Sequence, residues 1–203
     1  MKYPRKIALI GGIGGGKSVV SHIFRLLNIP VYDSDREAKR LIQTDPSIRA
    51  ELIALIGPNV YEKEILCKQI LAQYLFASNE HATQINKIVH PRVKLDFHHW
   101  SENFEPSVKL VALETALLYE SNMNEEIDSI WLIKAPEAVR LQRAMQRDKS
   151  SEESIFERMD KQASEESLVE LADRVVLNDG CHLLLPQILA YLSLESSSFP
   201  KIN

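Results

Sequence analysis

The chain has 203 residues, of which 45% are hydrophobic and 26% are charged. These proportions are typical of one globular domain and exclude a disordered or collagen-like chain. The net charge of −4 is not typical of nucleic-acid-binding proteins, which present a strongly basic surface.

Cysteine usage and hydropathy exclude two further classes of protein. Cys67 and Cys181 lie far apart and outside any Cys-x-x-Cys pair, so we expect two reduced thiols and neither a disulfide scaffold nor a zinc ribbon. No stretch approaches the roughly 20 apolar residues that a membrane span requires. We therefore expect a cytoplasmic protein.

The first predicted elements form a strand, a loop, a helix and a second strand. Residues 6–10 are a short apolar run before glycines, which is typical of a buried parallel strand. A helix begins at Lys17, and the second strand covers residues 29–32 and ends at Asp33. The helix has an apolar face, which we expect to be buried: Val19, Val20, Ile23, Leu26 and Leu27. This order predicts a βαβ unit with parallel strands.

Residues 35–100 are predicted to be largely helical. Ile48, Leu52 and Leu55 form a stripe that Gly57 and Pro58 end. Further helices are predicted at residues 65–77 and 85–100, the latter interrupted at His90-Pro91.

The second half of the chain alternates strands with helices again. We predict strands at residues 108–113, 129–133 and 174–177, and helices at residues 136–147 and 186–194. Residues 150–167 are rich in Ser and Glu and predict a mobile helical flap, capped by Ser150 with Glu153. The tail from Glu195 is expected to be frayed.

The loop after the first strand carries the strongest functional motif. Residues 11–18 satisfy GxxxxGK[ST] between a strand and a helix, and no GxGxxG register of a dinucleotide site fits them. The glycines let backbone N–H groups cradle phosphate oxygens, Lys17 reaches the β- and γ-phosphates, and the Ser18 hydroxyl ligates Mg²⁺. The predicted cofactor-binding residues are Gly12, Ile13, Gly14, Gly15, Gly16, Lys17, Ser18 and Val19. The motif predicts a site for a nucleoside triphosphate.

Other residues narrow the class of phosphate-loop protein. Asn86-Lys87 is not followed by the aspartate of a guanine reader, and a small-molecule kinase fits the chain length best. Asp33 and Asp35 follow the second strand, where a carboxylate either accepts a proton from an attacking hydroxyl or caps the next helix. The spacing leaves both roles open for Asp33.

Three arginines share one face of the predicted helix 136–147. Arg140, Arg143 and Arg147 are spaced i, i+3 and i+7. They either neutralise a triphosphate or form a solvated basic face, and the role of Arg140 stays open. His90 before a proline is more often a turn residue than a ligand contact, and with His98 and His99 it makes no zinc set.

Several motifs together resemble the dephospho-coenzyme A kinases. They are the phosphate loop, Val31-Tyr32-Asp33-Ser34-Asp35, Asn86-x-Ile88-x-His90-Pro91-x-Val93, Leu117-Leu118-Tyr119-Glu120, Gln142-Arg143-x-Met145-x-Arg147-Asp148, Arg158-x-x-x-Gln162, Ala172-Asp173 and Asn178-x-Gly180. They follow the order of the family from residue 8 to residue 180.

The resemblance implies an α/β fold of the phosphate-loop, nucleotide-kinase-like type, with a parallel sheet flanked by helices. It implies transfer of the γ-phosphoryl group of ATP, with Mg²⁺, to the ribose 3′-hydroxyl of dephospho-coenzyme A, the last step of coenzyme A synthesis. It also implies three regions. They are a core of residues 1–34, 105–147 and 169–203, a helical acceptor domain of residues 35–104, and a lid of residues 148–168.

The resemblance also assigns roles to matching positions. The implied catalytic residues are Asp33, as general base, with Lys17, Arg143 and Arg147. Arg143 and Asn178 join the loop in holding ATP. The implied acceptor-binding residues are Asp33, Asp35, Lys39, His90, Leu118 and Glu120.

Five positions depart from the family pattern: Gly15 for serine, Val19 for threonine, Lys39 for arginine, Glu114 for aspartate and Ala116 for proline. Lysine cannot reproduce the bidentate fork of arginine, and either Lys39 or the adjacent Arg40 takes the clamp position. Lys17, Ser18 and Asp33 are retained, so we expect an active enzyme.

Two other functions remain as alternatives. One is a kinase of another nucleoside or nucleotide on the same fold, and the other is a nucleotide-dependent switch that phosphorylates no metabolite. For the main reading we expect a monomer whose partner is a small molecule, with no nucleic-acid or membrane partner.

Overall fold

The computed structural model describes residues 3–160 and 162–197. Its centre is a five-stranded sheet in the order β2-β5-β1-β6-β7, in which all paired strands are parallel. The strands are β1 (Arg5–Ile10), β2 (Val31–Asp33), β5 (Leu110–Glu114), β6 (Ser129–Lys134) and β7 (Arg174–Leu177). This parallel α/β sheet confirms the predicted fold class, although β5 lies between the two strands of the predicted βαβ unit.

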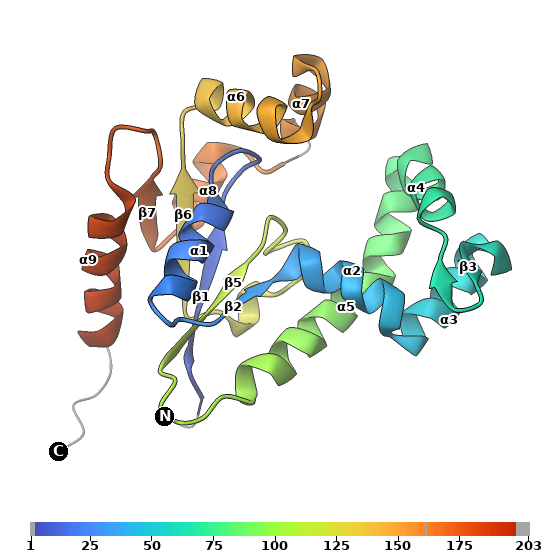
Figure 1. Ribbon diagram of the computed structural model, residues 1–203, viewed down its shortest axis with the longest axis horizontal. Coiled ribbons are helices and arrows are strands. Elements are labelled where there is room, and N and C mark those ends of the chain that lie inside the picture. Colours follow the sequence, from blue (N-terminus) through green and yellow to red (C-terminus); the bar gives the residue numbers. More distant parts are fainter. Residues whose placement is uncertain (1–2, 161, 198–203) are drawn as a thin grey trace.

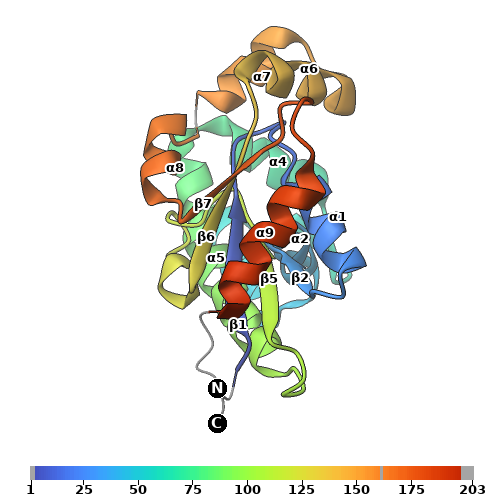
Figure 2. The same ribbon diagram turned by 90° about the vertical axis from the view of Figure 1, so that its left-hand side faces the viewer.

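Helices cover both faces of this sheet (Figures 1 and 2). They are α1 (Lys17–Leu26), α2 (Ser34–Thr44), α3 (Pro46–Ile56), α4 (Lys68–Ala77), α5 (Asn79–Glu102), α6 (Glu137–Asp148), α7 (Glu152–Met159), α8 (Glu165–Leu171) and α9 (Leu184–Ser197). Two single turns, η1 (Pro58–Val60) and η2 (Asn124–Glu126), and a hairpin of β3 (Tyr61–Glu62) and β4 (Ile65–Leu66) complete the description.

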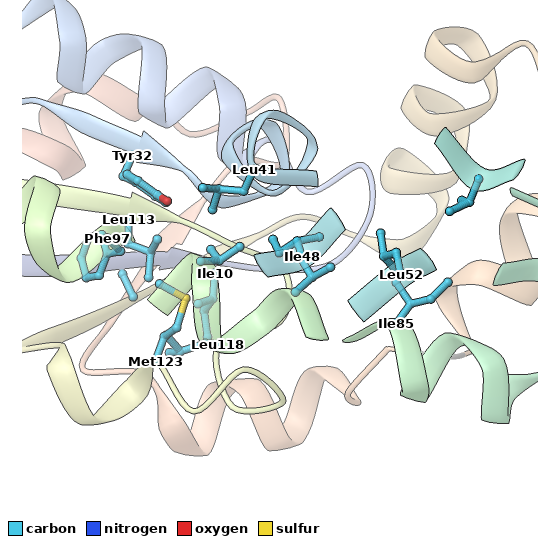
Figure 3. Packing of buried hydrophobic residues seen from close by; sticks show 14 of the residues in the cluster. Ile10, Tyr32, Leu41, Ile48, Leu52, Ile85, Phe97, Leu113, Leu118 and Met123 are labelled. Carbon is cyan, nitrogen blue, oxygen red and sulfur yellow. The ribbon is translucent and has the colours of Figure 1, made fainter. Parts of the chain in front are cut away.

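Side chains of β1 alternate between the two faces of the sheet, as the pleat of a strand requires. Ile7 and Leu9 pack with side chains of α1 and α9, and Figure 2 shows α9 crossing in front of the sheet. Ala8 and Ile10 belong to a second cluster, which extends from the sheet to α2, α3 and α5 (Figure 3). The phosphate loop therefore follows a strand that is fixed on both faces.

Helix α5 continues through Pro91 without a break, which contradicts the predicted interruption at His90-Pro91. A proline removes one backbone hydrogen bond of a helix and strains the preceding turn. Here the cost is offset by a stripe of buried side chains on both sides of Pro91, namely Ile85, Val89, Val93 and Phe97.

Local details differ from the prediction at three further places. Val19 and Leu26 of α1 are 49% and 68% exposed, so the predicted apolar face is only partly buried. The helix predicted at residues 65–77 begins only at Lys68, because residues 65 and 66 belong to the hairpin, whose turn has positive φ at Lys63 and Glu64. Ser151, one residue after the predicted Ser150, caps α7.

The predicted frayed tail begins too early. Glu195 is 1% exposed, pairs with Arg5 at 2.8 Å and accepts a hydrogen bond from Ser129 at 2.9 Å. The rest of that prediction, for residues 198–203, lies outside the described residues. Both cysteines are free, as expected.

Candidate active site

The glycines of the phosphate loop let it pack closely against α6 and against the segment after β7. Gly14 and Gly16 have φ of 76° and 98°, and α1 begins directly after them at Lys17. A Cβ atom on Gly14 would overlap the backbone of Arg140 in α6, and one on Gly16 would overlap the amide of Asn178. The loop is thus held between α6 and the segment after β7.

Replacing Gly14 by alanine is therefore expected to disrupt the loop. Alanine disfavours a φ of 76°, and its Cβ would meet backbone atoms that cannot rotate away. We expect ATP affinity to fall by at least about ten-fold, measured by titration calorimetry. Gly57→Ala is the matched control, because Gly57 also has a positive φ but open space around it. Normal ATP binding by Gly14→Ala would contradict this account of the loop.

Polar contacts fix the loop from three sides. Lys17 Nζ donates to the carbonyl oxygens of Gly11 at 2.6 Å and Gly12 at 3.4 Å. The backbone N–H of Ile13 donates to Gln162 Oε1 at 2.7 Å. Asn178 Nδ2 donates to the Gly15 carbonyl at 2.8 Å. The N–H of Ile13, which belongs to the predicted phosphate cradle, therefore donates to a side-chain oxygen in this structure.

Next to the loop lies a cavity of about 490 Å³ that joins three parts of the chain. Gly12, Ile13, Gly14 and Gly16 of the loop line it, as do Lys17, Ser18 and Val19 of the first turn of α1. The other charged side chains of its lining are Asp33, Asp35, Arg36, Lys39, Glu114, Arg143, Arg147 and Arg158. The structure therefore brings together all four residues predicted to be catalytic.

Two carboxylates stand at neighbouring strand ends in this cavity. Asp33 of β2 is in register with Glu114 of β5. Asp33 caps α2, because its Oδ1 accepts from the N–H of Arg36 at 3.0 Å. Burial raises the pKa of Glu114, and the charge of Asp33 raises it further, while Lys17 acts in the opposite direction. The helix-cap role considered for Asp33 is thus present, and it uses one oxygen of a carboxylate that faces the phosphate loop.

The arginines of α6 differ in what they contact. Arg143 and Arg147 line the cavity, and Arg143 Nη1 also donates to the Asn178 carbonyl at 2.9 Å. Arg140 lines an adjoining cavity, where its guanidinium lies against Gly12. Asn178, predicted to bind ATP, contacts the back of the loop and links it to Arg143.

A second cavity, of about 300 Å³, extends from the first between α2 and α5. Asp35 and Lys39, one helical turn apart on α2, line both cavities. Most of the second lining is apolar and includes Leu71, Leu75 and Val89. The charged cavity beside the phosphate loop thus adjoins an apolar one.

Arg40 has a different environment from Lys39. Its Nη2 donates to both carboxylate oxygens of Asp96 at 2.8 and 2.7 Å, and it also pairs with Glu37. Asp96 in turn accepts from the Tyr32 hydroxyl at 2.6 Å. Arg40 therefore connects α2 to α5, while Lys39 faces the cavities.

The remaining predicted acceptor residues line two other cavities: His90 lines the apolar one, and Leu118 and Glu120 line a small one beside Gly11 and Gly12 of the phosphate loop. His90 lines the apolar cavity, and burial lowers its pKa, with nearby Glu120 acting in the opposite direction. Leu118 is 2% exposed and belongs to the core, where it lines a cavity of about 150 Å³ with Glu120 and Gln162.

Several residues of the cavity lining have no role in the sequence-based assignment, among them Arg158, Gln162 and Glu114. Arg158 and Gln162 were visible only as a spaced pair, and the folding of α7 over the loop brings them to the cavity. Glu114 was noted only as a departure from a family pattern. Glu114 is the last residue of β5, which pairs with β1. This position was the available signal, because ligands bind at the carboxyl ends of parallel strands.

Comparison with known proteins gives a consistent match over nearly the whole chain. The family model of the dephospho-CoA kinases matches residues 5–183. A dephospho-CoA kinase of Bacteroides fragilis is 46% identical over 93% of this chain and 91% of its own length. One from Porphyromonas gingivalis is 44% identical over 96% of both chains.

Solved structures show the same fold. The Thermus thermophilus protein TT1252 matches with a TM-score of 0.81 and 28% identity over 95% of this chain and 98% of its own. The dephospho-CoA kinase of Campylobacter jejuni matches with a TM-score of 0.69 and 20% identity over 96% of this chain and 98% of its own.

Proposed function

The chain belongs to the dephospho-CoA kinase family, and we propose on this premise that it transfers the γ-phosphoryl group of ATP to the ribose 3′-hydroxyl of dephospho-coenzyme A. The observation that carries the proposal is the pair of cavities that share Asp35 and Lys39. One end has the cations and backbone donors that a triphosphate requires. The other is the kind of apolar pocket that receives a long organic acceptor.

The residues present fit ATP and its transferred group. Backbone N–H groups of the loop and the positive end of α1 hold the phosphates. Lys17, Arg143 and Arg147 neutralise the charge that develops on the transferring group, which ATP supplies.

The donor set also fits Mg²⁺. Within the described part of the chain, no three His, Cys, Asp or Glu side chains gather as a metal site. Mg²⁺ in kinases is held by few protein oxygens, with water and phosphate oxygens completing the octahedron. The Ser18 hydroxyl and the Glu114 carboxylate belong to residues that line the same cavity, and such a pair suits this kind of site.

Asp33 acts as the general base in this proposal. It removes the proton of the 3′-hydroxyl as the oxygen attacks the γ-phosphorus, and the bond from that phosphorus to the β,γ-bridging oxygen breaks. The N–H of Arg36 donates to Oδ1 and fixes the carboxylate. The other carboxylate oxygen, Oδ2, receives the proton.

We assign the three predicted regions of the chain to the acceptor, the lid and the phosphate-loop core. Residues 35–104 contain α2–α5 and the hairpin, and we assign them to the acceptor. Residues 148–168 contain α7 and part of α8, and act as a lid that excludes water. The remaining residues form the phosphate-loop core.

We expect Lys39 to bind the acceptor, whereas Arg40 joins α2 to α5 through its ion pair with Asp96. Lys39→Ala should raise KM for dephospho-coenzyme A about ten-fold through loss of a charged contact, with KM for ATP and the melting temperature unchanged. Arg40→Ala is the matched control and should leave KM for dephospho-coenzyme A unchanged, because Arg40 pairs with Asp96 and does not line the cavities. Steady-state kinetics and thermal unfolding of both variants test this. A raised acceptor KM in Arg40→Ala alone would reverse the assignment.

Product analysis tests the reaction itself. The protein should form ADP and coenzyme A from ATP and dephospho-coenzyme A, with the new phosphate on the 3′-oxygen by ³¹P NMR. ADP formation that does not depend on any acceptor would favour the switch protein instead.

Among residues 3–160 and 162–197, no helix is both long and apolar enough to cross a bilayer. The monomeric state, the cytoplasmic location and the lack of a nucleic-acid partner remain predictions. Light scattering after gel filtration would test the first.

A further inference from the structure

Asp148 forms the centre of a charged cluster beside the cavity that Lys17 and Asp33 line. It is the last residue of α6. Its Oδ1 accepts from Arg147 Nε at 2.7 Å, and its Oδ2 accepts from Arg147 Nη2 at 3.1 Å and from Arg158 Nη1 at 2.7 Å. Both arginines line the cavity that holds Lys17 and Asp33, but Asp148 itself is not among the lining residues.

We propose that Asp148 is a positioning residue that holds Arg147 and Arg158 together toward the triphosphate. The inference rests on the proposed function, because it takes the ligand of both arginines to be the phosphates of ATP.

Electrostatics explains why an anion is needed at this place. Two guanidinium groups that donate to one carboxylate oxygen lie close together, and like charges at such separations repel each other. One carboxylate offsets this repulsion. It engages Arg147 through two donors in a fixed fork, which orients the guanidinium plane.

The cluster connects two elements that the lid must bring together. Arg147 belongs to α6, whereas Arg158 belongs to α7, and Lys149 with φ of 51° turns the chain between them. Ile155 of α7 is fully buried. The buried side chain of Ile155 therefore anchors α7 to the rest of the protein. Asp148 in addition orients the guanidinium groups of Arg147 and Arg158.

Stability alone does not account for the cluster. The side chains of Arg147 and Arg158 are 60% and 47% exposed, and ion pairs at such exposure contribute little to folding. Arg147 and then Arg158 hold the pKa of Asp148 well below its usual range. The carboxylate therefore stays ionised throughout the neutral pH range.

ATP binding by four proteins tests this role: the wild type, Asp148→Ala, Arg147→Ala/Arg158→Ala and the triple variant. We expect Asp148→Ala to bind ATP about ten-fold more weakly, and the triple variant to bind as weakly as the double variant, within about three-fold. Titration calorimetry measures the affinities. A melting temperature within about 2 °C of wild type shows that the fold is kept.

Several outcomes would overturn the inference. Wild-type or tighter affinity in Asp148→Ala would show that the carboxylate does not position the arginines or that it repels the phosphates. A further ten-fold loss in the triple variant would show that Asp148 acts independently of both arginines. If Asp148→Ala does not fold, the isosteric Asp148→Asn carries the same comparison.

Glu157→Gln, at an exposed position of α7, is the matched control and should bind ATP as the wild type does. Absence of ATP binding in the wild type would instead contradict the proposed function. The two failures are therefore distinguishable.

Discussion

Asp33→Asn is expected to lower kcat by about two to four orders of magnitude, the usual contribution of a general base, with ATP affinity changed by less than about three-fold. Asparagine does not take up the proton of the acceptor hydroxyl. It still offers an oxygen to the N–H of Arg36 and so preserves the cap of α2. Single-turnover kinetics with dephospho-coenzyme A, together with calorimetry of ATP binding, separate the chemical step from binding.

Two controls accompany this variant. Asp33→Ala removes the cap as well as the base, so it should lower the melting temperature where Asp33→Asn does not. Glu51→Gln, at an exposed position of α3, should retain full activity. If Asp33→Asn turned over at the wild-type rate, Asp33 would be a helix cap and nothing more.

Lys17→Ala is expected to lower kcat by about two to three orders of magnitude. The ammonium group lies within hydrogen-bond distance of the carbonyl oxygens of Gly11 and Gly12, at the start of the loop. In the proposed function this positive charge stabilises the negative charge that develops on the transferring group. Lys68→Ala, at an exposed position of α4, is the control and should leave kcat unchanged.

The charge of Lys17 also predicts a pH dependence. Burial lowers the pKa of Lys17, although Glu114 and Asp35 act in the opposite direction. The ammonium therefore loses its proton at a lower pH than an exposed lysine does, and ATP affinity should decline on the alkaline side before about pH 10.4. Lys17→Ala should lack this alkaline decline. A decline of equal size in the variant would assign it to another group.

The fold could be predicted from the sequence where local patterns agree with tertiary packing. The glycine loop between a strand and a helix is one such place, since strand, turn and anion cradle all require the same residues. The prediction was wrong at Pro91, where a buried stripe on α5 outweighs the local preference of proline. It was also wrong at Glu195, whose partners Arg5 and Ser129 are distant in sequence.

The site could be predicted to a similar extent. Lys17, Ser18 and Asp33 follow strand ends, so the parallel sheet alone places them together. The choice between Lys39 and Arg40 could not be made from the sequence, because it depends on how α2 rotates against Asp96 of α5. The convergence of Arg147 and Arg158 on Asp148 likewise required the turn between α6 and α7.

Acceptor selectivity tests the central claim most directly. We would measure ATP-dependent turnover with dephospho-coenzyme A, adenosine, AMP, CMP and no acceptor. We expect kcat/KM for dephospho-coenzyme A to exceed that for every other acceptor by about a hundred-fold or more, because in the proposed function this acceptor alone extends into the apolar cavity between α2 and α5. Preference for a mononucleotide, or equal ATP consumption without acceptor, would contradict the proposed function.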